Sequence, residues 1–275
     1  MDGLLTGFVD LPAVQMHYYR TGGNKPPLVM VHGISDDGLC WSRVARELAA
    51  DYDCVMVDMR GHGKSSAPQD GYTIENLGRE LAEFIQKLGL HKPIVLGHSM
   101  GALTTLVMAS LFPALPGAIL LEDPPGFWVA KPPDDQDAAY RQRLIDNFDQ
   151  QKRMTKDELV AEAREGKRYW SEEDIEDWAN AKHRFSYRIA ELVRPPDLRS
   201  QQLIGQLNQI SCPALFIAGE PACGALATTE DIDALKKLIP QLQAEKIENA
   251  GHSIRRYQFD AYIRVVKNFL AGLSR

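Results

Sequence analysis

Residues 93–107, PIVLGHSMGALTTLV, constrain the fold more than any other part of the chain. The segment opens with a short apolar run, typical of a buried strand, and continues from residue 100 with the pattern of a helix. Between the two stands Gly97-His98-Ser99-Met100-Gly101, which fits G-x-S-x-G. After a strand and before a helix, this pattern predicts a serine hydroxyl that projects from a sheet edge at a helix N-terminus. An ordinary strand-to-helix turn is the plainer alternative.

The rest of the chain alternates between short apolar runs and amphipathic stretches. An alternating segment at 8–20 predicts an opening antiparallel hairpin. The later pattern of strand, helix, strand, helix predicts a mostly parallel sheet with helices on both faces. The expected strands are 26–33, 54–58, 93–97, 117–122, 213–219 and 244–248, and the expected helices are 41–50, 73–88, 100–111, 230–239 and 255–271.

One long segment interrupts this alternation. Between Asp123 and Ser211 the sequence contains no convincing strand, and polar stretches of helical character follow a segment rich in proline and acid. We therefore expect residues 126–205 to be a helical insertion, and residues 1–125 and 206–275 to form the α/β core. The aromatic residues of the insertion are candidates for its underside or for a pocket, and Trp128 is the first choice for contacting a substrate.

Composition limits the classes of partner. The net charge is −6 and the pI is about 5.7, so a nucleic-acid partner is not expected. There is no lysine- or arginine-rich run for an anionic membrane and no apolar stretch of roughly 20 residues to cross one. The N-terminus lacks the pattern of a signal peptide, and the four cysteines are scattered without a CxxC pair. These features favour a cytoplasmic protein with reduced cysteines and without a metal site.

Ser99 needs a base, because a serine hydroxyl is a weak nucleophile by itself. The best-placed of the seven histidines is His252, in the loop between the last predicted strand and the last predicted helix. Since that loop reaches the same edge of the sheet as Ser99, the two side chains are expected to meet there. A serine with a histidine base predicts an acyl-enzyme mechanism on a carbonyl compound.

In combination, VHGI (31–34), DMRGHGKS (58–65), GHSMG (97–101) and NAGH (249–252) resemble the α/β-hydrolase fold superfamily. The resemblance covers nearly the whole chain outside 126–205. It implies an eight-stranded, mostly parallel sheet flanked by helices, with 126–205 inserted after strand six as a helical cap, or lid, over the active site. It further implies an oxyanion hole formed by the backbone N–H groups of Ile34 and Met100.

The acid of the implied Ser-His-acid triad has more than one candidate. Many family members place it after the seventh strand, where this chain has Glu220 in place of an aspartate. Others place it at the end of the sixth strand, where Glu122 or Asp123 is available, and counting along the strand favours Glu122 of these two. We expect Glu220, because the segment after it resembles the more common arrangement.

The predicted function is hydrolysis of an ester or lactone in a small, largely apolar substrate. Serine at the nucleophile position argues against epoxide hydrolases and dehalogenases of the same fold, which use aspartate there. A carbon–carbon bond hydrolase, an acyltransferase and a ligand-binding receptor with little turnover remain alternatives. No cofactor is expected, and a homodimer is left open.

Overall fold

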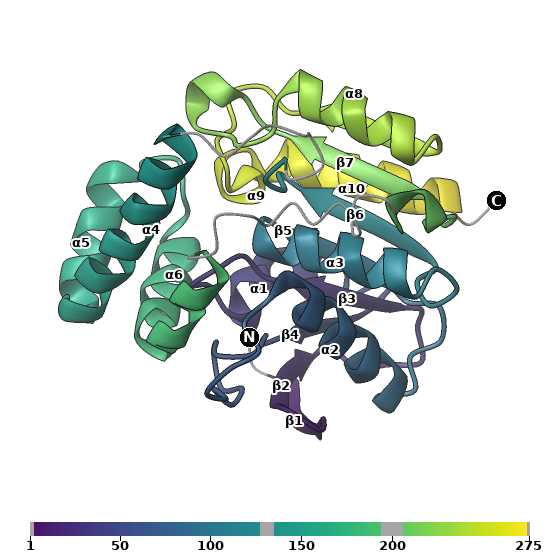
Figure 1. Ribbon diagram of the computed structural model, residues 1–275, viewed down its shortest axis with the longest axis horizontal. Helices are drawn as coiled ribbons and strands as arrows, with labels where there is room; N and C mark the ends of the chain where they lie inside the picture. The colour runs from purple at the N-terminus through teal and green to yellow at the C-terminus, as the bar shows by residue number, and fades with distance from the viewer. Residues whose placement is uncertain (1–2, 127–134, 194–205, 274–275) are drawn as a thin grey trace.

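The computed structural model describes residues 3–126, 135–193 and 206–273, and it centres on one eight-stranded sheet (Figure 1). The strand order is β1-β2-β4-β3-β5-β6-β7-β8, with β5 between β3 and β6. β1 and β2 form the predicted antiparallel hairpin, and β2 also pairs antiparallel with β4, whereas the remaining pairs are parallel. The strands are β1 (Leu5–Asp10), β2 (Gln15–Arg20), β3 (Pro27–Val31), β4 (Asp53–Val57), β5 (Ile94–His98), β6 (Ala118–Glu122), β7 (Ala214–Ala218) and β8 (Leu242–Lys246).

Helices cover both faces of the sheet, because successive strand residues point to opposite sides. On β3, Val29 and Val31 join the core beneath one set of helices, and Leu28 and Met30 join the core beneath the other. The first set is α2 (Ile74–Lys87), α3 (Met100–Leu111) and α8 (Thr229–Leu238). The second set is α1 (Ser42–Leu48), α9 (Ile254–Tyr257) and α10 (Phe259–Leu273).

Most predicted elements lie within a few residues of their expected positions. Thr73 caps α2 by accepting a hydrogen bond from the backbone N–H of Asn76, and Gly89 follows the helix with a φ of +64°. β8 begins two residues earlier than expected, at Leu242. The expected last helix is divided into α9 and α10 at Gln258, whose φ of −133° and ψ of 61° are not helical.

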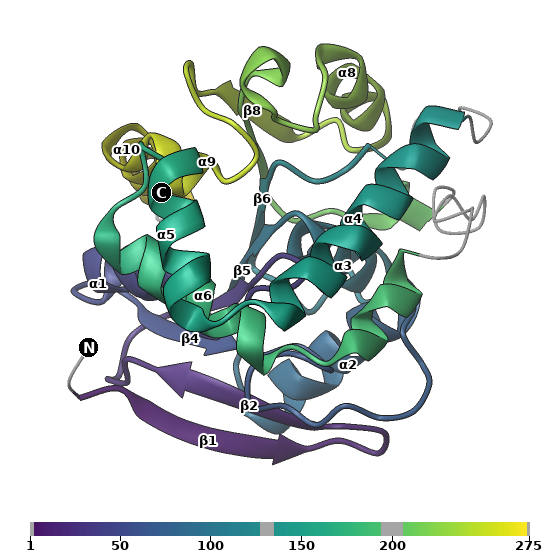
Figure 2. The same cartoon turned by 90° about the vertical axis from the view of Figure 1, so that its left-hand side faces the viewer.

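Between β6 and β7 the described residues form α4 (Asp135–Arg153), α5 (Lys156–Gly166), α6 (Glu172–Arg184) and a 3-10 turn, η2 (Tyr187–Leu192). Residues 135–193 contain no strand, as the sequence predicts. Figure 2 shows α4, α5 and α6 together in front of the sheet. α5 and α6 share a small apolar cluster of their own, separate from the two large cores: Leu159, Val160, Ala163, Ile175, Trp178 and Ala179. The exact limits of the inserted segment stay a prediction, because residues 127–134 and 194–205 lie outside the described ranges.

No helix in the described ranges is both long and apolar enough to span a bilayer. All four cysteines are free, and three of them, Cys40, Cys54 and Cys212, are buried. Burial raises the pKa of the Cys40 thiol and of the Cys54 thiol, so both stay protonated and serve as small packing residues.

Candidate active site

Ser99 occupies the turn between β5 and α3 in a strained backbone conformation. Its φ is +53° and its ψ is −117°, a combination that residues with a side chain rarely adopt. Its backbone N–H donates to the carbonyl oxygen of Glu122 at 2.9 Å, and its own carbonyl accepts from Ala102 at 3.0 Å in the first turn of α3. The conformation is therefore imposed by the neighbouring strand and by the helix that follows.

The two glycines that flank Ser99 are required by close backbone packing. A Cβ atom on Gly97 would lie 2.3 Å from the carbonyl oxygen of Gly101, and one on Gly101 would lie 2.2 Å from that of Val31. Both distances are well below van der Waals contact with backbone atoms, which cannot move aside. Any other residue at either position would displace the turn that holds the hydroxyl.

His252 is hydrogen-bonded to a carboxylate through Nδ1, which lies 2.6 Å from Asp123 Oδ2. Asp123 also accepts hydrogen bonds from the backbone N–H groups of Leu226 at 2.8 Å and Ala227 at 3.0 Å. The carboxylate is fully buried, and its backbone φ is +42°. Three donors therefore fix the orientation of the carboxylate, and through it the orientation of the imidazole, with Nε2 left for another partner.

Glu220, the acid that the sequence favours, has different partners. Its Oε2 accepts from the backbone N–H of Asn249 at 3.0 Å, and its Oε1 lies 3.3 Å from Lys246 Nζ. These contacts, with the lysine beside it, hold the pKa of the Glu220 carboxyl below its usual range. The residue stabilises the loop between β8 and α9, while the imidazole of that loop turns toward Asp123.

Glu122, the second candidate, forms a buried ion pair on the other side of the strand. Its Oε2 lies 3.0 Å from Arg255 Nη1, and its Oε1 accepts from the Arg255 backbone N–H at 3.1 Å. Burial raises the pKa of the Glu122 carboxyl, and Arg255 opposes that shift. The carboxylate holds the start of α9 against the sheet.

The strand register explains why Asp123 reaches the histidine. His98 pairs with Glu122 across β5 and β6, so the next residues along the two strands, Ser99 and Asp123, come level at the sheet edge. Adjacent strand residues point to opposite faces, which separates Glu122 from Asp123. Counting one residue past the end of both strands, and not to the last strand residue, is the sequence signal that favours Asp123.

Ser99 and His252 line one cavity of about 370 Å³. Strand-end loops and the start of α9 form one side of it, and α4, the α5–α6 turn and α6 form the other. The lining residues of the first side are Gly33, Ile34, Ser35, Asp36, His98, Ser99, Cys223, Gly224, His252, Ser253, Arg256 and Tyr257. Those of the second side are Tyr140, Leu144, Asn147, Phe148, Gln151, Lys167, Trp170, Trp178 and Lys182.

The loop after β3 reaches Ser99, as the resemblance implies. A Cβ atom on Gly33 would lie 3.3 Å from the Cβ of Ser99, and Ile34 lines the cavity. Met100 is the first residue of α3, so its N–H has no acceptor within the helix. The backbone near Ser99 is therefore suited to receive negative charge.

Several buried groups hold the segment 33–36 in place. Ser35 has a φ of +62°, and its N–H donates to Nε2 of His62 at 3.1 Å. Lys182 of α6 donates to the carbonyl and hydroxyl oxygens of Ser35 at 3.0 Å and 2.9 Å. The helices between β6 and β7 are thus connected directly to the loop beside the serine.

His98, which precedes the serine, supports the other histidine. Its Nε2 donates to the backbone carbonyl of His252 at 3.0 Å, and the two rings lie 4.7 Å apart. Burial, together with the nearby Arg255, lowers the pKa of His98 well below its usual value. His98 is therefore a neutral donor that positions the His252 loop.

The cavity is more polar than the apolar pocket that the sequence predicts. Four aromatic residues of the insertion, Tyr140, Phe148, Trp170 and Trp178, line it, but Asp36, Lys182 and Arg256 are buried around the same cavity. Trp128, the first choice for substrate contact, lies outside the described residues. Sequence reasoning missed the three charged residues because their charges resemble those of solvated surfaces until the fold turns them inward.

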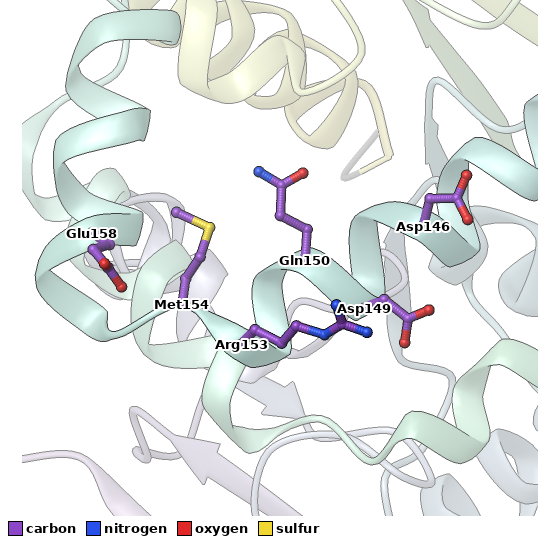
Figure 3. Close-up of a pocket in the computed structure, with 6 residues that line it drawn as sticks. All are labelled: Asp146, Asp149, Gln150, Arg153, Met154 and Glu158. Carbon is purple, nitrogen blue, oxygen red and sulfur yellow. The ribbon is translucent and has the colours of Figure 1, made fainter.

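A second hollow of about 460 Å³ lies apart from Ser99 and His252, along α4 and the start of α5 (Figure 3). Its lining includes three carboxylates and no serine or histidine: Asp146, Asp149, Gln150, Arg153, Met154 and Glu158. It offers no nucleophile–base pair. Across the described parts of the chain, no group of three or more His, Cys, Asp or Glu side chains could hold a metal ion.

The family of the alpha/beta hydrolase fold matches residues 26–254, so the chain belongs to that family and is an α/β-hydrolase. N-formylmaleamate deformylase of Pseudomonas putida is 29% identical over 96% of this chain and 96% of its own. Epoxide hydrolase 1 of Caenorhabditis elegans is 25% identical over 98% of this chain and 71% of its own. The solved structure of E-2-(acetamidomethylene)succinate hydrolase shares the fold with a TM-score of 0.82 and 20% identity, over 98% of this chain and 99% of its own.

Proposed function

We propose that the protein is a serine hydrolase in which Ser99 is the nucleophile, His252 the base and Asp123 the acid. One observation carries the proposal: the cavity that exposes Ser99 also exposes an imidazole whose Nδ1 is held 2.6 Å from a buried carboxylate. The carboxylate fixes the tautomer that leaves Nε2 free to accept a proton, which is the requirement for activating a serine.

The reaction then has two steps, acylation of Ser99 and hydrolysis of the acyl-enzyme. The Ser99 Oγ attacks the acyl carbon while its proton moves to His252 Nε2, and the imidazolium is stabilised by Asp123. The tetrahedral intermediate collapses, the bond to the leaving group breaks, and His252 donates the proton to that group. Water then attacks the acyl-enzyme, with His252 as base, and releases the carboxylic acid.

The oxyanion hole in this proposal consists of the N–H groups of Ile34 and Met100. The proximity of Gly33 to Ser99 and the unpaired position of Met100 at the start of α3 support the assignment. Two such donors stabilise negative charge on the carbonyl oxygen more strongly in the transition state than in the ground state, and losing one typically costs about 3 kcal/mol of barrier.

The substrate is an acyl compound, and esters or lactones are the first candidates because a serine nucleophile forms an acyl-enzyme with them. N-acyl compounds are a second candidate, since the names of two relatives, N-formylmaleamate deformylase and E-2-(acetamidomethylene)succinate hydrolase, contain an N-acyl group. Serine at the nucleophile position weighs against epoxide opening, although one relative is named an epoxide hydrolase.

A fluorophosphonate probe and short p-nitrophenyl esters test the proposal together. We expect the probe to add to the tryptic peptide that contains Ser99, and ester turnover to be lost in Ser99→Ala. Ser253→Ala is the matched control, because Ser253 is a second serine that lines the same cavity. Labelling elsewhere, or full turnover by Ser99→Ala, would contradict the assignment. Ligand binding without turnover would indicate a receptor, and product only with an added alcohol would indicate an acyltransferase.

A further inference from the structure

The charged side chains in the wall of the cavity are unbalanced. Among the described lining residues, three cations, Lys167, Lys182 and Arg256, face a single carboxylate, Asp36. Arg255 lies close by, with Nη2 3.8 Å from Asp36 Oδ2, but its own charge is compensated by Glu122. The cavity therefore holds an excess of positive charge, although the chain as a whole is acidic.

Arg256 is the most deeply buried of these three cations. It is 2% exposed, and its Nη1 donates to Asp36 Oδ2 at 3.1 Å. Its Nε and Nη2 have no hydrogen-bond partner among the described residues, and the carboxylate of Asp174 is no closer than 4.0 Å to Nε. Since a buried donor without an acceptor is costly, part of this guanidinium is available for an acceptor that enters the cavity.

Lys167 and Arg256 both lie over the ring of Trp170. Its Nζ lies 4.8 Å from the ring centroid of Trp170, and the guanidinium carbon of Arg256 lies 4.5 Å from that centroid. Within the described ranges, Lys167 makes neither a hydrogen bond nor an ion pair through its side chain. Desolvation, with repulsion from Arg256, lowers the pKa of the Lys167 ammonium, as expected for two cations held near each other.

The remaining charges in this wall are already committed. Lys182 directs its ammonium to both oxygens of Ser35 and lies 3.5 Å from Asp36 Oδ1. Asp36 is thus shared between Lys182 and Arg256, and among the described residues it forms no ion pair with Lys167. Arg256 and Lys167 are the cations with free capacity, and both line the cavity that contains Ser99.

We propose that Arg256 and Lys167 bind a carboxylate of the substrate, so that the natural substrate is an acyl compound that carries a second, ionised carboxyl group. The placement of its reacting carbonyl against Ser99 rests on the function proposed above, whereas the binding of the carboxylate does not. Guanidinium and ammonium donors suit a carboxylate oxygen pair, and the burial of Arg256 away from bulk water strengthens the attraction.

Binding is tested first, in a variant that is not expected to hydrolyse a substrate. Isothermal titration of Ser99→Ala with succinate, and with neutral succinamide as its counterpart, compares the charged and uncharged ligands. We expect succinate to bind at least tenfold more tightly than succinamide. Adding Lys167→Gln to the Ser99→Ala variant should weaken the affinity for succinate by at least fivefold. Arg168→Gln, at an exposed position next in the chain, is the control and leaves the affinity unchanged. Equal affinities for the two ligands would overturn the proposal.

Kinetics then test the substrate class with monomethyl succinate and methyl butyrate, which differ by a carboxylate in place of a methyl group. We expect kcat/KM to favour monomethyl succinate by at least tenfold, and Lys167→Gln to reduce that preference by at least fivefold. Arg256→Lys, which keeps the charge and loses the planar fork, should weaken succinate binding while the protein stays folded.

The two proposals fail in different ways. Hydrolysis of methyl butyrate without a preference for the anionic ester would refute the carboxylate site and leave the serine hydrolase intact. Succinate binding that depends on Lys167, with no hydrolysis of either ester, would support the carboxylate site and count against the proposed chemistry.

Discussion

The two sides of the cavity differ in how their residues are held. The side formed by strand-end loops, the catalytic wall, contains strained backbone at Ser35 and Ser99 and is fixed by the sheet behind it. The side formed by α4, the α5–α6 turn and α6, the helical wall, depends partly on a small apolar cluster between α5 and α6. The difference indicates that the strained backbone around Ser99 is supported by the sheet, whereas the helical wall contributes side chains to the cavity from a separate small cluster.

The largest effect is expected for the catalytic wall, at the Asp123 carboxylate that contacts His252. Asp123→Asn should lower kcat by about 10⁴-fold, because the amide no longer fixes the required imidazole tautomer. Glu220→Gln, after the next strand, should stay within about twofold of the parent by the same steady-state assay. A large loss in Glu220→Gln with a mild effect of Asp123→Asn would reverse our assignment of the acid.

The next effect tests the support of the catalytic wall. Glu122→Gln leaves Arg255 buried without its counter-charge, and breaking such a pair typically costs about 3–5 kcal/mol of folding free energy. Urea denaturation should show this loss. Glu47→Gln, which breaks an ion pair of half-exposed side chains with Lys267, should cost at most about 1 kcal/mol. Equal losses of folding free energy in the two variants would contradict a larger contribution of the buried Glu122–Arg255 pair.

A helical-wall variant should change substrate affinity more than turnover. Leu144→Ala removes apolar contact from the cavity, and we expect KM for an alkyl ester to rise about tenfold with kcat nearly unchanged. Gln142→Ala, at an exposed position of the same helix, is the control. A fall in kcat with constant KM would show that the helical wall takes part in the chemical step.

The smallest effect concerns stability on the helical side. Burial, with repulsion from Asp37 and Glu173, raises the pKa of Asp177 to about 7. A raised carboxyl pKa stabilises the fold at low pH, and this contribution is lost as pH rises from about 4 through 7. Asp177→Asn should therefore raise Tm by a few degrees at pH 8 and by less at pH 5, as differential scanning fluorimetry would show. The same gain at both pH values would contradict the shifted pKa.

The sheet was predictable because its signals are local. Five-residue apolar strands and the glycine pair around Ser99 determine the core, and the order of segments places His252 near the serine. The carboxylate that contacts His252 was harder to predict, because Glu122, Asp123 and Glu220 are all plausible by spacing. Only the register between β5 and β6, a long-range property, separates Asp123 from its neighbour.

The cationic lining was not predictable for a related reason. Lys167, Lys182 and Arg256 occupy helix ends and charged stretches that look like solvated faces in sequence. Their burial depends on how α4 to α6 pack against the sheet edge. A charge pattern in one helix contains no information on which neighbouring segment will cover it.

The adjacency of Glu122 and Asp123 has a consequence for how this chain can change in length. Inserting one residue in β6 would bring the Glu122 carboxylate to the position from which Asp123 contacts the imidazole, and deleting one would bring the Asp123 carboxylate to the position beside the Arg255 guanidinium. Loops elsewhere can lengthen without such an exchange. Descendants of this sequence that keep its chemistry should therefore preserve the residue count from Ala118 to Asp123, even where the side chains between them drift.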